Sequence, residues 1–225
     1  MTKAPKFVSL GGNCQPVVHI RRIFGSPDIP YVFDWLECGI DAVSLLITTQ
    51  FAGFFLRGAL LFEWVDGTLE VTDQRCGIIS RHHFKSDDAE HVEQVSMALR
   101  LMGRRFMQLL RSDEPVIFVR RWIDKDGQKR DEPSRDLHKL LKTYKPECGF
   151  LYLQHHDEGL PFVDGNYVMA FNPETRNIDD WEGYATIYDA NFACAVCAYK
   201  TKFPPSSGQS CGSNAAVTLP DRRIF

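Results

Sequence analysis

The sequence predicts a single α/β domain with a mostly parallel sheet flanked by helices and a cysteine at the first strand-to-helix turn. Strand-like and helix-like segments alternate along the chain, most clearly helix 89–110, strand 115–119, helix 134–145 and strand 150–153. Both strands are continuous apolar runs, which is typical of strands covered on both faces. This order favours βαβ units, in which the strands are parallel.

The first strand and helix follow this pattern. Residues 7–10 form an apolar run that ends in two glycines. From Pro16 the apolar residues recur at helical spacing as far as Phe24, and Gly25 is expected to end the helix. The cysteine at the turn, Cys14, therefore lies just before this helix.

The region that follows is expected to hold a second helix and short strands. Asp41 is expected to cap a helix that continues to about Phe51. Residues 51–55 and 60–64 form an aromatic-rich patch. Segments 68–72 and 77–80 alternate in polarity around turn residues and are predicted to be short strands.

The longest predicted helix, 89–110, is opened by Asp87 or Asp88. Apolar residues at helical spacing are expected to form its buried stripe. They are Val92, Val95, Met97, Leu99, Leu101, Met102, Phe106, Leu109 and Leu110.

The C-terminal part continues the alternation. Ser134 is expected to cap a helix that Pro146 stops, a strand at 167–171 should follow a turn at 164–166, and a last helix is predicted within 179–190. The predicted domain comprises residues 1–200. Residues 201–225 are rich in Pro, Ser and Gly and are expected to form a flexible tail.

Composition limits the possible functions. The chain has 26 basic and 29 acidic residues, which gives no electrostatic footprint for nucleic acid or for an anionic membrane. No segment approaches the roughly 20 apolar residues of a membrane-spanning helix. The N-terminus lacks the apolar core of a signal peptide, so a cytoplasmic location is expected.

Neither a metal nor a cofactor is expected. The seven cysteines follow no disulfide or zinc spacing and are interpreted as reduced thiols. Cys194 and Cys197 form a CxxC pair that is expected to serve packing or to belong to a frayed tail. No P-loop, GxGxxG, HExxH or EF-hand spacing occurs.

Cys14 is a candidate nucleophile because it follows Gly11-Gly-Asn13 at a strand-to-helix turn. The helix dipole and free backbone N–H groups at such a turn should lower the pKa of the thiol and could hold an oxyanion. The donors would be the N–H groups around Gly12, Asn13 and Cys14, plus the Asn13 amide. Alternatively, the glycines and Asn13 only supply the positive φ of a tight turn.

A general base could come from either of two histidine pairs. His82 and His83 follow a predicted strand, and His155 and His156 follow strand 150–153. The carboxyl ends of parallel strands share one edge of the sheet. The rim that holds Cys14 is therefore expected to include His155, His156, Arg120 and Arg121 as well. A structural role remains open for each histidine.

Asp34 lies between Phe33 and Trp35, where an unpaired carboxylate would be costly to bury. It could orient a histidine, pair with Arg21 or Arg22, or accept backbone N–H groups as a cap.

These residues resemble a known family. Ser9-Leu-Gly-Gly-Asn-Cys14, His19-Ile-Arg-Arg22 and Val32-Phe-Asp-Trp-Leu36 are similar to the SLGxNC…LRR…PFDW opening of a bacterial family of uncharacterised proteins labelled papain-like cysteine peptidases. The resemblance implies that Cys14 is the nucleophile, His82 or else His83 the base, and Asp34 a candidate orienting acid. A papain-like α+β fold is the alternative that it implies.

The Gly-Asn-Cys-Gln run is also similar to the opening of a capsule-polysaccharide acyltransferase family. The candidate oxyanion or substrate-binding residues are Gly12, Asn13, Gln15 and Arg120. The expected function is cysteine-dependent acyl transfer to or from a peptide or small acyl donor. A polysaccharide-biosynthesis acyltransferase and a non-enzymatic glycan- or nucleotide-binding module are the alternatives, and the oligomeric state is not predicted.

Overall fold

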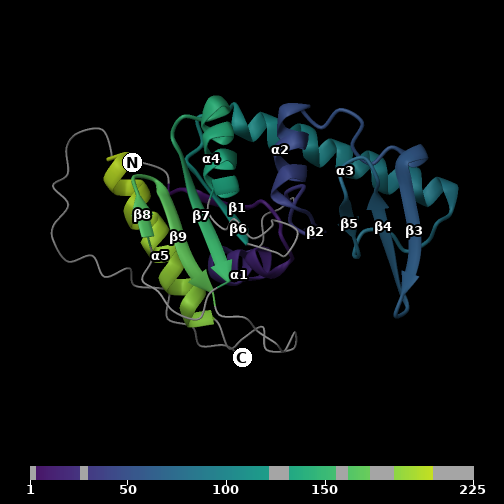
Figure 1. Ribbon diagram of the computed structural model, residues 1–225, viewed down its shortest axis with the longest axis horizontal. Helices are drawn as coiled ribbons and strands as arrows, with labels where there is room; N and C mark the ends of the chain where they lie inside the picture. The colour runs from purple at the N-terminus through teal and green to yellow at the C-terminus, as the bar shows by residue number, and fades with distance from the viewer. Residues whose placement is uncertain (1–3, 26–29, 122–131, 156–161, 173–184, 205–225) are drawn as a thin grey trace.

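The computed structural model describes residues 4–25, 30–121, 132–155, 162–172 and 185–204. These residues form a mixed α/β fold with two sheets (Figure 1). Sheet A has the strand order β1 (Lys6–Ser9), β6 (Val116–Arg121), β7 (Cys148–His155), β9 (Tyr167–Asn172), β8 (Phe162–Asp164). The first four strands are parallel and β8 is antiparallel. The predicted parallel sheet is therefore confirmed for sheet A.

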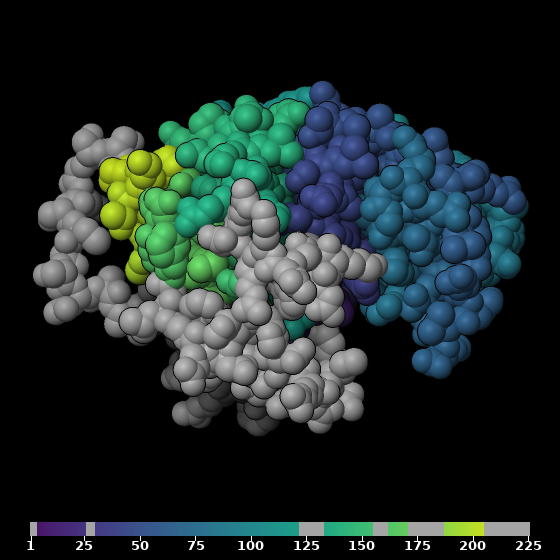
Figure 2. Space-filling view, viewed as in Figure 1, coloured from purple at the N-terminus to yellow at the C-terminus, as the bar shows by residue number. Residues whose placement is uncertain are grey.

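Sheet B is a second, antiparallel sheet that was not predicted from the sequence. Its strand order is β2 (Leu36–Glu37), β5 (Ile78–Ser80), β4 (Thr68–Asp73), β3 (Leu60–Val65). The expected strands at 68–72 and 77–80 are β4 and β5, whereas β3 was expected only as an aromatic patch. In the space-filling view, the residues of β3, β4 and β5 lie in the right-hand part of the molecule, coloured blue (Figure 2).

Helices cover both faces of sheet A, whose inner strands β6 and β7 are apolar and buried on both sides. On one face α1 (Gln15–Phe24) and α5 (Ala185–Lys202) pack on Ile117, Val119 and Leu151. On the other face a larger core joins Phe118 and Phe150 to α2 (Ile40–Thr48), α3 (Ala89–Leu110), α4 (Glu132–Tyr144) and sheet B. Between α2 and β3 lies the short 3-10 helix η1 (Arg57–Ala59). Figure 1 shows α3 extending along the molecule toward sheet B.

Several predicted helix positions need correction. The N-cap of α2 is Gly39, so Asp41 lies in the first turn, and the helix ends at Thr48. Asp88 caps α3 as predicted, and its carboxylate accepts the Glu90 N–H. In the predicted stripe, however, Met97 and Leu101 are exposed, because they lie on the side of α3 that faces away from the core.

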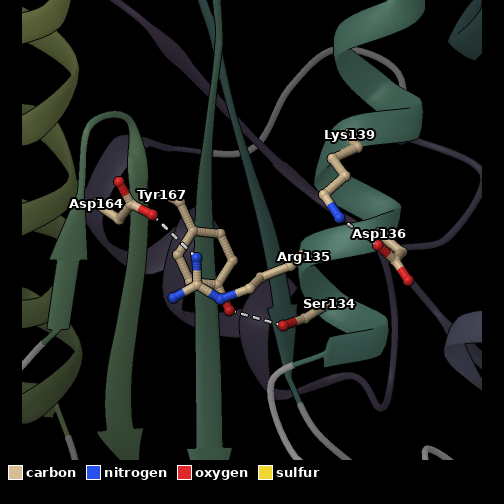
Figure 3. Close-up of polar contacts among 6 residues, drawn as sticks. All are labelled: Ser134, Arg135, Asp136, Lys139, Asp164 and Tyr167. Carbon is tan, nitrogen blue, oxygen red and sulfur yellow. Dashed lines mark hydrogen bonds and ion pairs between the residues drawn. The ribbon is translucent and has the colours of Figure 1, made fainter.

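Helix α4 begins before its predicted cap. Ser134 lies inside the first turn, and its hydroxyl hydrogen-bonds to the Tyr167 hydroxyl of β9 at 2.7 Å (Figure 3). Next to it, Arg135 lies over the Tyr167 ring and pairs with Asp164 at 3.0 Å. These contacts fix α4 on the strands β8 and β9.

The last helix, α5, begins at Ala185 and continues to Lys202, so it extends well beyond the predicted range 179–190. Residues 179–184 lie outside the described part of the chain. Cys194 and Cys197 both lie on α5 and line a surface pocket with Val163 of β8. Most of the predicted tail also lies outside the described residues.

Among the described residues, no helix combines the length and the apolar character needed to cross a membrane. Within the described ranges, no cluster of three or more His, Cys, Asp or Glu side chains is arranged to hold a metal ion.

Candidate functional site

The turn between β1 and α1 can be made only with glycine. Gly11 and Gly12 have φ values of 73° and 96°, in the region that favours glycine. A Cβ on Gly11 would lie 2.6 Å from Cys38 Sγ, and one on Gly12 would lie 2.2 Å from the Arg121 carbonyl oxygen. The turn is therefore wedged between β2 and the end of β6, and it fixes the position of the residues that follow.

Cys14 is the N-cap of α1 and is half-buried. The Asn13 side-chain oxygen accepts the Gln15 N–H at 3.1 Å, and Ser9 Oγ accepts the Gly11 N–H at 3.1 Å. Among the described residues, the N–H groups of Gly12, Asn13 and Cys14 meet no acceptor in another residue. Free donors at the positive end of a helix are suited to hold an oxyanion.

Burial controls the protonation of Cys14. Loss of solvation raises the pKa of the thiol above its ordinary value, and this effect outweighs its own backbone N–H and the nearby Arg121 and Arg81, which lower the pKa. The sequence predicted that the strand-to-helix turn lowers the pKa of this thiol, and this prediction needs correction. The groups that lower the pKa are present, but the effect of burial is larger. The resting thiol is protonated at neutral pH.

The charges around Cys14 come from β2, from β6 and from the residue that follows β5. Arg81 bridges Glu37 at 3.3 Å and Glu70 at 2.7 Å. Glu37 raises the pKa of the Cys14 thiol, whereas Arg81 and Arg121 lower it. Arg81 and Glu37 were not predicted to be site residues, because only the pairing of β2 with β5 brings them to this turn.

His82 and His83 directly follow β5, and they differ in environment. His83 is the more buried, its Nδ1 lies 2.8 Å from Ser80 Oγ, and burial lowers its pKa to about 4. His82 is exposed and packs its ring against Trp35 at 5.6 Å between centroids. Burial, Lys85 and Arg81 lower the pKa of His82. Neither histidine hydrogen-bonds to Cys14 Sγ in this structure.

Asp34 is buried and belongs to a structural cluster. Its carboxylate accepts the Tyr31 N–H at 3.0 Å and lies 3.4 Å from the Arg21 guanidinium, which in turn lies over Trp35. Burial raises the pKa of Asp34 to about 6, although the Tyr31 N–H and Arg21 lower it. Of the roles that the sequence suggested for Asp34, pairing with Arg21 and capping of a backbone N–H are therefore both present. The described residues give Asp34 no contact with His82 or His83.

Arg120 and Gln15 face away from solvent. Arg120 is fully buried and donates to the carbonyl oxygens of Leu10 at 3.0 Å and Cys38 at 2.7 Å. Gln15 is buried, and its side-chain oxygen accepts the Tyr188 hydroxyl at 3.3 Å. Both residues hold the turn against its neighbours, so their described contacts are structural and not those of substrate-binding groups.

Arg121 and Arg120 point to opposite faces of sheet A, as neighbours on a strand must. Arg121 lies on the α1 side with Ile117 and Val119. The backbone of His155 ends β7 at the same edge, opposite Asn172 of β9. His156 lies outside the described residues. Of the predicted rim, the described residues therefore place Arg121 next to the Cys14 turn and the His155 backbone at the same edge of sheet A.

Comparisons with known proteins place the chain in a family. A family model described as "Putative papain-like cysteine peptidase" matches residues 5–152, from β1 to the middle of β7. The match includes Cys14, both histidines of the 82–83 pair and Arg120. No curated protein and no solved structure matches the chain. Since the family model covers well over half of the 225 residues, the chain belongs to this family.

Proposed function

We propose that the protein is a cysteine-dependent acyl hydrolase of the peptidase type, with Cys14 as nucleophile and His82 as general base. The observation that carries the proposal is the glycine turn, which holds a thiol beside backbone N–H groups that have no other acceptor among the described residues. A nucleophile and an oxyanion site next to each other are what acyl transfer requires.

His82 is preferred over His83 as the base. His83 is held by Ser80, and its pKa of about 4 makes it a weak proton acceptor. His82 is exposed beside Trp35, on the β2–β5 side of the Cys14 turn, and its lowered pKa keeps it neutral at pH 7. Hydrogen bonds between catalytic groups are often long before substrate binds. The lack of a hydrogen bond between Cys14 and His82 in this structure is therefore compatible with this role.

The mechanism starts from a neutral thiol and a neutral imidazole. His82 takes the Cys14 proton as the sulfur attacks the acyl carbon, and the Gly12–Cys14 N–H groups bind the resulting oxyanion. The leaving group then departs with the proton held by His82, which leaves a thioester. Water attacks the thioester, gives one proton to His82, and releases the acid while the proton returns to the Cys14 sulfur.

A reactive aryl ester tests this function without knowledge of the natural substrate. With p-nitrophenyl acetate we expect a burst of nitrophenolate and an acetyl group on the Cys14 peptide by mass spectrometry. Cys14→Ala should abolish both signals. Cys76→Ala is the matched control, because Cys76 is also half-buried and its variant should behave as the wild type.

Histidine variants assign the base. His82→Gln should slow acylation by about a hundredfold or more, whereas His83→Gln should change it little. Full acylation activity in Cys14→Ala, or an acetyl group on another cysteine only, would contradict the proposal and favour a binding module. The same slowing in His83→Gln, with His82→Gln unaffected, would move the base to His83.

A further inference from the structure

We propose that Arg121 forms an anion-binding subsite beside Cys14, so that the acyl donor carries a negatively charged group close to its reacting carbonyl. This inference rests on the proposed function and narrows its substrate class. Arg121 is the last residue of β6 and lies at the edge of sheet A.

The backbone places Arg121 next to the nucleophile turn. The register pairs Ser9 with Val119, so Arg121 lies two residues further along β6, where β1 has already turned into Gly11 and Gly12. A Cβ on Gly12 would lie 2.2 Å from the Arg121 carbonyl oxygen and 3.5 Å from the Arg121 Cβ. Arg121 is therefore packed against the loop that carries Cys14.

The side chain of Arg121 lies on the face where α1 begins. Ile117 and Val119 pack in the core under α1 and α5, and strand alternation puts Arg121 on that same face. Arg120, on the other face, is used for the buried contacts with Leu10 and Cys38. The half-buried Arg121 is thus the arginine of β6 that remains near solvent.

The charge balance around Cys14 leaves Arg121 uncompensated. Arg81 is held by Glu37 and Glu70, and Arg21 by Asp34. In the described part of the chain, Arg121 forms neither an ion pair nor a side-chain hydrogen bond. A guanidinium presents several donors in a planar fork that matches a carboxylate or a phosphate, so it provides a ready partner for either group.

A pair of alkylating reagents of similar size tests the subsite directly. Iodoacetate carries a carboxylate and iodoacetamide does not, so the ratio of their rates at Cys14 measures attraction of an anion and cancels changes in thiolate fraction. We expect this ratio to fall about fivefold in Arg121→Gln and to be largely kept in Arg121→Lys. It should also fall when salt is raised from about 0.1 M to about 1 M.

Arg104→Gln, on an exposed position of α3, is the matched control for the loss of one positive charge and should leave the ratio unchanged. Slower alkylation of Cys14 by iodoacetamide in the presence of succinate would identify a carboxylate subsite, and slowing by inorganic phosphate a phosphate subsite. An equal ratio in wild type and Arg121→Gln, with no protection by either anion, would overturn the inference. An acetylated Cys14 in the ester experiment would in that case still support the proposed function.

Discussion

Burial and local charge act in opposite directions on Cys14. Arg121, Arg81 and the Cys14 backbone N–H all stabilise the thiolate, but loss of solvation outweighs them and raises the pKa. A thiol of this kind becomes a nucleophile only as its proton leaves, so the base controls the rate. This differs from a site in which a thiolate and an imidazolium exist before substrate binds, and it gives His82 more importance than it would have there.

The raised pKa predicts the pH dependence of alkylation. Because the thiolate is the reactive form, the rate of Cys14 with iodoacetamide should reach half its maximum above the ordinary cysteine value of about 8.5. Arg81→Gln should move this midpoint still higher, since it removes a positive charge and releases Glu37. Cys76, whose pKa burial raises to about 12, should react more slowly in the same samples. A Cys14 midpoint below about pH 8 would show that burial does not dominate.

The β1–α1 connection combines two constraints, conformation and space. Gly12 has a positive φ and also touches the Arg121 carbonyl, whereas Gly67, in the β3–β4 turn, has a φ of 77° and no atom within 4 Å of the position that a methyl group would occupy. The two positions share the backbone strain that an alanine would suffer but differ in steric contact. They therefore separate the two effects experimentally.

Gly67→Ala should lower the free energy of unfolding by about 1 kcal/mol, the typical cost of a left-handed alanine. Gly12→Ala should lower it distinctly more, because its methyl group must displace the end of β6. Urea unfolding measures both variants, and the iodoacetamide rate at Cys14 should change only in Gly12→Ala. Equal losses in the two variants would mean that the turn relaxes freely and does not position Cys14.

Elements with a strong local signal were predictable. The helical spacing of apolar residues and the Asp88 cap located α3, and apolar runs located β6 and β7. β3 was missed because its apolar residues occupy both faces, so the alternation typical of a strand is absent. The choice between Arg120 and Arg121 depends on which face of β6 meets the Cys14 turn, and this is fixed only by the crossover and by sheet B.

At the scale of the whole molecule, the fold extends past the region that defines the family. The family model ends at residue 152, but the core beneath α1 is completed by α5, which contributes Tyr188, Phe192 and Tyr199. Phe192 packs edge-on against Phe7 of β1 at 4.8 Å between ring centroids. The first strand and the last helix are therefore joined, and α5 is expected to unfold together with the residues that carry Cys14.

Phe192→Ala tests this coupling. Phe192 is 2% exposed, and its truncation should cost about 3–5 kcal/mol, whereas Phe162 of β8 is 44% exposed and Phe162→Ala should cost much less. Cys38 and Cys148 are fully buried on the opposite side of sheet A from α5, so thiol labelling in urea reports their exposure. In Phe192→Ala both thiols should become labelled at the same, lower urea concentration at which helical circular dichroism is lost. Loss of part of the helical signal while Cys38 and Cys148 stay protected would show instead that α5 unfolds as a separate unit.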